Sequence, residues 1–122
     1  MSKSETVLVL GASDNPARYS YLATRMLLDY GYRVWLTGRR AGEVLGHRIT
    51  TSFPQTGTID TVTLYVGPDN QGDFMQPVEQ LKPRRVLFNP GTENPEWQEK
   101  LNAIGIETEN ACTLVLLSSG QF

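Results

Sequence analysis

The 122-residue sequence has few of the residues that build disulfides and metal sites. It contains one cysteine, Cys112, and one histidine, His47. A single cysteine excludes an internal disulfide and is typical of proteins from reducing compartments. Because no His, Cys or acidic residues cluster at ligand spacing, the sequence predicts no metal site.

Long apolar stretches are absent too. No apolar run approaches the roughly 18 residues that a membrane-spanning helix needs. Asp14, Asn15 and Pro16 interrupt the first twenty residues, where a secretory signal would need an apolar core. We therefore expect a cytoplasmic protein that does not associate with membranes.

Basic and acidic residues nearly balance. Eleven basic and thirteen acidic residues give a formal net charge of -2 at pH 7. This balance gives no reason to expect nucleic acid or an anionic membrane as a partner, so an anionic ligand would have to be held by local groups. The length is that of one domain, which we expect to comprise residues 1–122.

Five short apolar or β-branched runs predict β-strands, at residues 6–10, 33–37, 61–66, 85–89 and, more weakly, 106–108. The runs are continuous, which indicates strands that are covered on both faces, as in a parallel sheet. Between them lie segments with helical spacing of apolar residues, at residues 19–30, 74–81 and 97–104. Gly31, Pro83 and Gly105 end these segments.

This alternation predicts an α/β protein with a Rossmann-like open parallel sheet of about five strands and helices on both faces. Residues 40–60 give a weaker signal, and we expect a loop there, with at most a short strand or irregular turn. Residues 112–117 fit either a last helix or a last strand. Ligands of such sheets bind outside the carboxyl ends of the strands, so the candidate site comprises the loops that follow them.

The first of these loops has the sequence GASDNPARYS, residues 11–20. Gly11 permits a tight turn, Ser13 offers a hydroxyl, and the start of the next helix supplies unpaired amides. Arg18 adds a guanidinium group suited to phosphate oxygens. The loop therefore predicts a phosphate site. The alternative is that Ser13 or Asp14 caps the helix and that Arg18 is solvated.

The second loop distinguishes between nucleotides. NAD-binding Rossmann domains usually place an acidic residue after the second strand, to bind the ribose hydroxyl. This chain has Thr37, Gly38, Arg39 and Arg40 at that place. Paired arginines favour a phosphorylated ribose, as in coenzyme A (CoA) or NADP, although either arginine taken alone could be an ordinary surface charge.

Residues for catalysis are scarce. Hydride transfer needs a proton donor near the nicotinamide, and no nucleophile, base and orienting acid can be assembled from this sequence. His47 lies in the region of weak signal, and Cys112 follows the last predicted strand. We expect binding without catalysis and assign no catalytic residue. The alternatives are an NADP- or other nucleotide-dependent enzyme that recruits a tyrosine, and a regulatory partner subunit with a vestigial pocket.

The sequence resembles the CoA-binding domain family, which comprises small Rossmann-like proteins related to the CoA-binding domain of the succinyl-CoA synthetase α subunit. The family shows G-A-S, then P-x-R-x-S, then an apolar helix and G-Y-x-V. The matching residues are Gly11, Ala12, Ser13, Pro16, Arg18, Ser20, Leu27, Gly31, Tyr32 and Val34. The resemblance extends over nearly the whole chain and includes Gly91 and Cys112.

The resemblance implies a CoA or acyl-CoA ligand, with its ADP end at the first two loops and its pantetheine arm passing Val66, Gly67 and Pro68. NADP is the less favoured cofactor, and a homo-oligomer or a partner protein is possible. The loops and the resemblance together predict these ligand-binding residues: Gly11, Ala12, Ser13, Arg18, Tyr19, Ser20, Thr37, Gly38, Arg39, Arg40, Val66, Gly67, Pro68, Asn89, Gly91 and Cys112.

Overall fold

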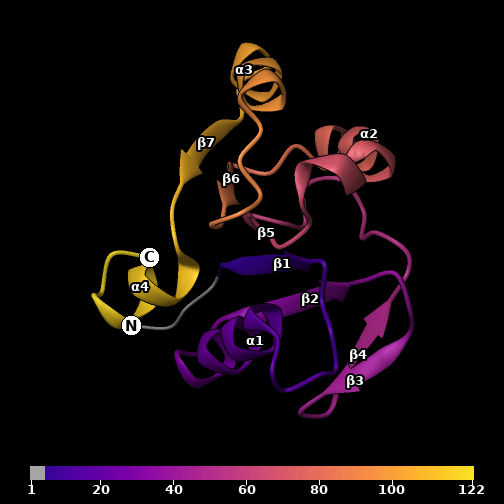
Figure 1. Ribbon diagram of the computed structural model, residues 1–122, viewed down its shortest axis with the longest axis vertical. Coiled ribbons are helices and arrows are strands. Elements are labelled where there is room, and N and C mark those ends of the chain that lie inside the picture. The colour runs from indigo at the N-terminus through magenta and orange to yellow at the C-terminus, as the bar shows by residue number, and fades with distance from the viewer. Residues whose placement is uncertain (1–4) are drawn as a thin grey trace.

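The computed structural model describes residues 5–122, which form a seven-stranded sheet with helices on both faces (Figure 1). The strands are β1 (Thr6–Leu10), β2 (Arg33–Thr37), β3 (Gly42–Val44), β4 (His47–Thr50), β5 (Thr61–Leu64), β6 (Arg85–Phe88) and β7 (Glu107–Asn110). Their order in the sheet is β3-β4-β2-β1-β5-β6-β7. All neighbouring strands are parallel except β3 and β4.

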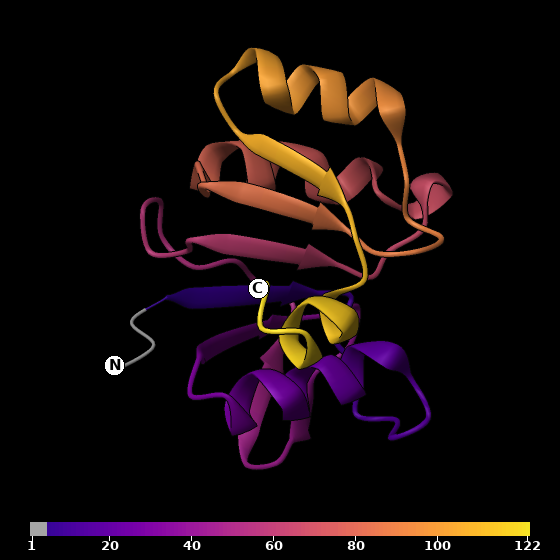
Figure 2. The ribbon, with the colours of Figure 1, turned by 90° about the vertical axis from the view of Figure 1, so that its left-hand side faces the viewer.

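The helices of the described residues are α1 (Tyr19–Asp29), the short 3-10 helix η1 (Pro68–Asn70), α2 (Gly72–Leu81), α3 (Pro95–Ala103) and α4 (Thr113–Ser118). α1 and α4 lie on one face of the sheet, and α2 and α3 lie on the other (Figure 2). Within residues 5–122, no helix has both the length and the apolar character that crossing a membrane requires.

The central strand β1 contributes to two hydrophobic cores. Val7 and Val9 pack in the cluster that contains residues of α1 and α4, whereas Leu8 and Leu10 pack in the cluster that contains residues of α2 and α3. Side chains alternate between the faces of a strand, so a strand that is buried on both faces is apolar throughout. The predicted Rossmann-like fold is confirmed, with all five predicted strands present.

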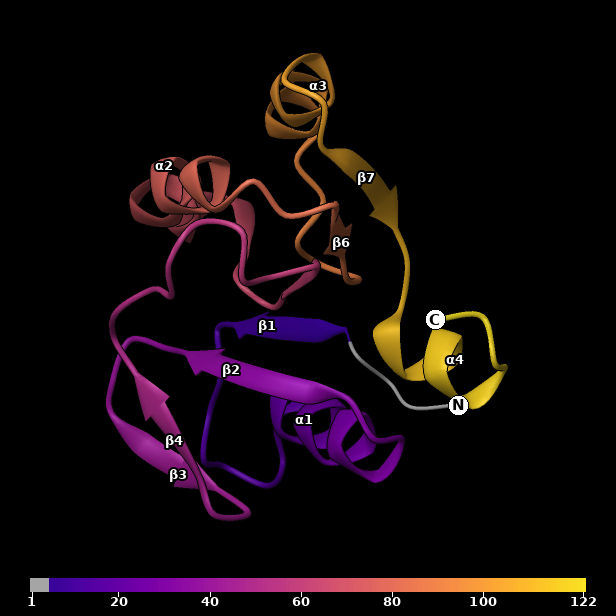
Figure 3. The same ribbon diagram turned by 180° about the vertical axis from the view of Figure 1, so that it is seen from behind.

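Two strands were not predicted. Residues 40–60 contain the antiparallel hairpin of β3 and β4, which extends the sheet beside β2 (Figure 3). Its two-residue turn has positive φ at both positions, 51° at Leu45 and 86° at Gly46. Such turns favour Asn or Asp before the glycine. The exposed Leu45 at this position gives no turn signal, so the sequence does not predict the hairpin. The C-terminal segment, for which helix and strand were both open, forms helix α4.

The order of the strands fixes the place of the candidate site. From the central strand β1, the chain adds β2 on one side and later β5 on the other. The strand order therefore reverses at β1, and the loops after β1, β2 and β5 diverge at one end of the sheet. In open α/β sheets, this is where ligands bind.

Candidate functional site

A cleft of about 780 Å³ opens at the carboxyl ends of the central strands. Four loops surround it, which we call loop 1 (residues 11–18, after β1), loop 2 (residues 38–41, after β2), loop 3 (residues 65–71, after β5) and loop 4 (residues 89–94, after β6). The volume lies in the range of small-molecule and cofactor sites, roughly 300–1,000 Å³.

Main-chain contacts hold loops 1 and 2 together. The main-chain oxygen of Thr37, at the end of β2, accepts hydrogen bonds from the amides of Gly11 at 2.9 Å and Ala12 at 3.0 Å. Gly11 has a φ of 95°, and a Cβ there would lie 2.9 Å from Cγ2 of Val66. Both the backbone conformation and the close approach therefore require glycine at the first position of the loop.

Two of the predicted ligand-binding residues hold these loops and do not line the cleft. The hydroxyl of Thr37 donates to the main-chain oxygen of Ser52 at 2.9 Å, and Gly38 is buried against loop 1. Thr37 and Gly38 therefore help to shape the cleft, and this role needs no direct contact with a ligand.

The N-terminus of helix α1 is not capped by a side chain. Arg18 occupies the N-cap position, no side chain accepts a hydrogen bond there, and the first turn contains no acidic residue. Ser13 and Asn15 instead accept amides within loop 1, from Asn15 at 3.1 Å and Ala17 at 3.0 Å. The alternative reading, in which Ser13 or Asp14 caps the helix, is wrong. The first turn keeps amides available to an anion.

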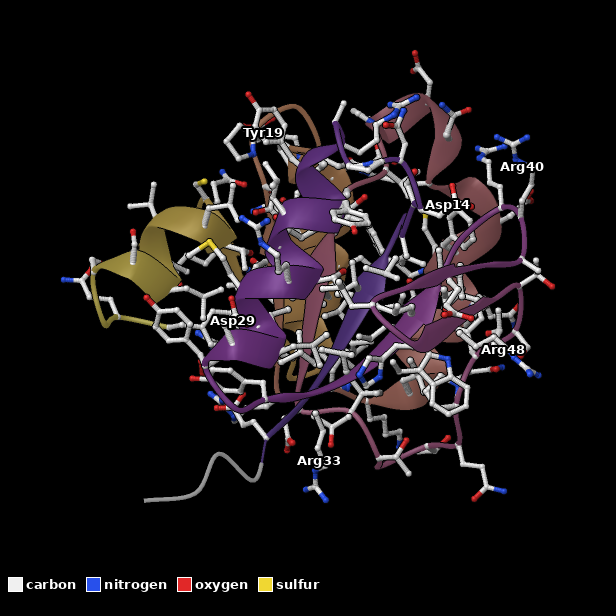
Figure 4. All side chains as sticks on the ribbon, turned by 90° about the horizontal axis from the view of Figure 1, so that it is seen from below. Asp14, Tyr19, Asp29, Arg33, Arg40 and Arg48 are labelled. Atoms are coloured by element: carbon white, nitrogen blue, oxygen red, sulfur yellow. The ribbon has the colours of Figure 1, made fainter. Side chains whose placement is uncertain are left out.

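Three arginines line the cleft, and all are solvent-exposed: Arg18 in loop 1, and Arg39 and Arg40 in loop 2. Within residues 5–122, none of the three forms an ion pair or a side-chain hydrogen bond. Asp14 is the one acidic residue of the lining. Figure 4 shows Asp14 and Arg40 on neighbouring loops at one end of the molecule. The cleft thus has a positive surface within a chain of net charge -2.

The other part of the cleft is apolar and narrow. Val66 and Gly67 of loop 3, Phe74 of α2, and Pro90 and Gly91 of loop 4 line it. A Cβ at Gly67 would lie 3.8 Å from the main-chain oxygen of Gly91, so the two loops approach each other closely here. The cleft can therefore hold a ligand with a phosphorylated end and a slender uncharged arm.

Residues 5–118 match the family model of the CoA binding domain. The chain belongs to the CoA-binding domain family. The sequence resemblance to this family is thereby confirmed. No curated protein matches the chain.

Several solved structures have the same fold as this chain, in agreement with the family membership. A crystal structure of an uncharacterized protein is 45% identical, with a TM-score of 0.94 over 99% of this chain and 100% of that one. The structure of cell-free ID.343 from Thermus thermophilus is 25% identical, with a TM-score of 0.86 over 98% of this chain and 91% of that one. The dinucleotide forming acetyl-coenzyme A synthetase 1 of Ca. Korarchaeum cryptofilum is 19% identical, with a TM-score of 0.70 over 88% of this chain and 26% of that one. At that identity, the last comparison shows the fold alone.

The predicted ligand-binding residues of this CoA-binding domain divide into two groups. Those that line the cleft are Gly11, Ala12, Ser13, Arg18, Tyr19, Ser20, Arg39, Arg40, Val66, Gly67 and Gly91. Those outside the lining are Thr37, Gly38, Pro68, Asn89 and Cys112. Contact of either group with a ligand stays a prediction.

Asn89 is buried beneath the cleft. Its Nδ2 donates to Oγ1 of Thr63 at 2.8 Å and to the main-chain oxygen of Leu64 at 2.9 Å, and its Oδ1 accepts the amide of Thr113 at 2.8 Å. These bonds join the ends of β5 and β6 to the start of α4. Cys112, a half-buried free thiol, is the N-cap residue of that helix.

Asp14, Asn70, Pro90 and Thr92 line the cleft from loops that were predicted to form the site, although these residues were not singled out, whereas Ala41, Ile49, Tyr65 and Phe74 were not predicted. Ala41 and Tyr65 adjoin predicted residues in the same loops. Ile49 and Phe74 come from β4 and α2, and only the packing of these elements against the loops brings them to the cleft.

Among the described residues, no two titratable side chains of the cleft lining are hydrogen-bonded or ion-paired to each other. Burial raises the pKa of Tyr65 to about 12, so its hydroxyl stays protonated at neutral pH. His47 is exposed on β4 and does not line the cleft, nor does Cys112. Within residues 5–122, no three His, Cys, Asp or Glu side chains form a group that could hold a metal ion.

Proposed function

We propose that the cleft binds CoA or an acyl-CoA. The observation that supports this most directly is a group of three arginines, Arg18, Arg39 and Arg40, which form no ion pair or side-chain hydrogen bond within residues 5–122 and line the same cleft as the uncapped start of α1. Guanidinium groups and helix N-termini are the usual ligands of phosphate in proteins. Membership of the CoA-binding domain family selects CoA among phosphorylated nucleotides.

Each part of the ligand has a corresponding part of the cleft. The diphosphate would lie at loop 1, where Arg18 and the first turn of α1 supply donors. Arg39 and Arg40 would bind the 3′-phosphate of the ribose, which CoA carries and dephospho-CoA lacks. The uncharged pantetheine arm would pass through the apolar part of the cleft, between Gly67 and Gly91.

We further propose that the protein binds this ligand without transforming it. A general base near neutral pH needs a matched pKa and a hydrogen-bonded partner. Tyr65 holds its proton to about pH 12, and within residues 5–122 its buried hydroxyl forms no hydrogen bond. Asp14, the acidic residue of the lining, is solvent-exposed.

Calorimetric titration with CoA, dephospho-CoA, NADP and NAD tests the proposal. We expect CoA to bind about tenfold more tightly than dephospho-CoA, since charge-assisted hydrogen bonds to the 3′-phosphate contribute about 1.4 kcal/mol. NAD should bind more weakly than either. Equal affinity for CoA and dephospho-CoA would remove the role of Arg39 and Arg40, and tighter binding of NADP than of CoA would overturn the assignment of the ligand.

A further inference from the structure

Within residues 5–122, loops 3 and 4, which form the two walls of the narrow part of the cleft, are not paired by main-chain hydrogen bonds beyond the ends of their strands. The pairing of β5 with β6 ends at Leu64 and Phe88. Among the described residues, no main-chain hydrogen bond joins residues 65–71 to residues 89–94. Main-chain bonds therefore do not set the distance between these walls.

The side chain of Gln71 connects the two walls. Gln71 is fully buried, and its Nε2 donates to the main-chain oxygen of Val66 at 2.9 Å and to that of Thr92 at 2.8 Å. The carboxamide has two donor hydrogens, and each loop accepts one of them. The remaining group, Oε1, accepts Nδ2 of Asn94 at 2.8 Å. Asn94 in turn caps α3 through the amide of Trp97.

We propose that Gln71 is a positioning residue that sets the width of the cleft between loops 3 and 4. It would thereby determine the affinity for the pantetheine arm of the ligand. This role rests on the proposed function, because it assumes that CoA occupies the cleft. Gln71 itself is covered by the loops that it joins and makes no contact with the ligand.

The chemistry of the side chain explains why glutamine is needed. A carboxylate at this position would place negative charge against two carbonyl oxygens. Asparagine is one methylene shorter and could not reach both walls. Methionine has similar length and volume but no donor, so it would leave the oxygens of Val66 and Thr92 without this partner.

The rest of the cleft is held in another way, which makes the role of Gln71 testable. The main-chain oxygen of Thr37 joins loops 1 and 2 directly. Loss of the Gln71 carboxamide should therefore widen the pantetheine part and leave the phosphate part unchanged. Adenosine 3′,5′-bisphosphate has the ribose phosphates of CoA without the pantetheine arm, so it reports on the phosphate part alone.

The test compares Gln71→Met with Gln76→Met, an exposed glutamine on helix α2, which begins directly after Gln71. We expect Gln71→Met to weaken CoA about tenfold and to change the affinity for adenosine 3′,5′-bisphosphate less than twofold, whereas Gln76→Met should change neither. Unchanged CoA affinity in Gln71→Met overturns the positioning role alone, as does an equal loss for both ligands. No CoA binding by the unmodified protein overturns the proposed function and this role with it.

A second measurement needs no variant, in case Gln71→Met does not fold. In the unmodified protein, NMR should show both carboxamide protons of Gln71 protected from exchange with solvent. Their chemical shifts should change on titration with CoA and stay nearly constant with adenosine 3′,5′-bisphosphate. Rapid exchange of either proton, or equal shifts with the two ligands, contradicts the role.

Discussion

A Cβ atom at Gly38 would lie 2.5 Å from the main-chain oxygen of Ala12. That distance is far below van der Waals contact, and the obstacle is backbone, which cannot rotate away. Loops 1 and 2 can approach each other only because Gly38 has no side chain. The same approach places Arg39 and Arg40 in the lining of the cleft that also contains the start of α1.

Gly38→Ala should therefore destabilise the protein by about 1–3 kcal/mol, the usual effect of overpacking at a closed position. CoA affinity should fall as well, because the added methyl group pushes loop 2 away from loop 1. Urea denaturation and calorimetry measure the two effects. Gly72→Ala is the matched control, since nothing lies within 4 Å of a Cβ there. A Gly38→Ala variant as stable as this control would show that the loops separate at little cost.

Removal of the two loop 2 arginines should abolish the distinction between CoA and dephospho-CoA. Arg39→Ala combined with Arg40→Ala should weaken CoA about tenfold, to the affinity of dephospho-CoA, since the charge-assisted contacts to the 3′-phosphate contribute about 1.4 kcal/mol. Dephospho-CoA should bind as before. Arg48→Ala, on exposed β4 outside the cleft, is the control and should leave both affinities unchanged. Similar losses of affinity for CoA and dephospho-CoA would indicate that the arginines bind a part that these two molecules share.

Asn89 should be a determinant of stability. Asn89→Ala removes three buried hydrogen bonds and leaves the amide of Thr113 unpaired, so we expect a loss of about 2–4 kcal/mol of the free energy of unfolding. Chemical denaturation measures this loss. Asn110→Ala, at the exposed end of β7, should change the stability by less than about 0.5 kcal/mol. Equal stability of Asn89→Ala and Asn110→Ala would contradict the stabilising role of Asn89.

Tyr65 should make stability depend on alkaline pH. Burial raises its pKa from about 10 in the unfolded chain to about 12 in the folded protein, while the nearby hydroxyls of Thr63 and Thr113 weaken the shift. The folded state therefore keeps a proton that the unfolded state loses. The resulting stability is fully present below pH 10 and is lost as the pH rises from 10 to 12, by up to about 2 kcal/mol.

Tyr65→Phe should remove this dependence. The buried hydroxyl of Tyr65 forms no hydrogen bond with the described residues, so the variant should match or exceed the unmodified protein in stability at neutral pH. Thermal denaturation of both proteins from pH 8 to 11.5 measures the difference, with Tyr30→Phe, an exposed tyrosine, as the control. Parallel stability curves for Tyr65→Phe and the unmodified protein across this range would contradict the raised pKa.

Local sequence determined the five main strands, the first three α-helices and the identity of the first two loops. Runs such as Thr6–Leu10 are apolar because helices cover both faces of the sheet. Consecutive residues of such a strand are therefore all buried, and the sequence shows an unbroken apolar run. Gly11, Arg18, Arg39 and Arg40 lie next to strand ends, so the parallel fold alone brings them to one edge.

Tertiary structure decided the rest. Gln71 is a polar residue beside a helix start, and nothing in its neighbours distinguishes a solvated side chain from one that joins two loops. Asn89 was predicted as a ligand-binding residue, which stays a prediction, but its buried bonds to Thr63 and Thr113, which come from distant parts of the chain, were not predicted. The direction of a polar side chain depends on which partners other segments supply, and the pairing of those segments is settled only when the whole sheet forms.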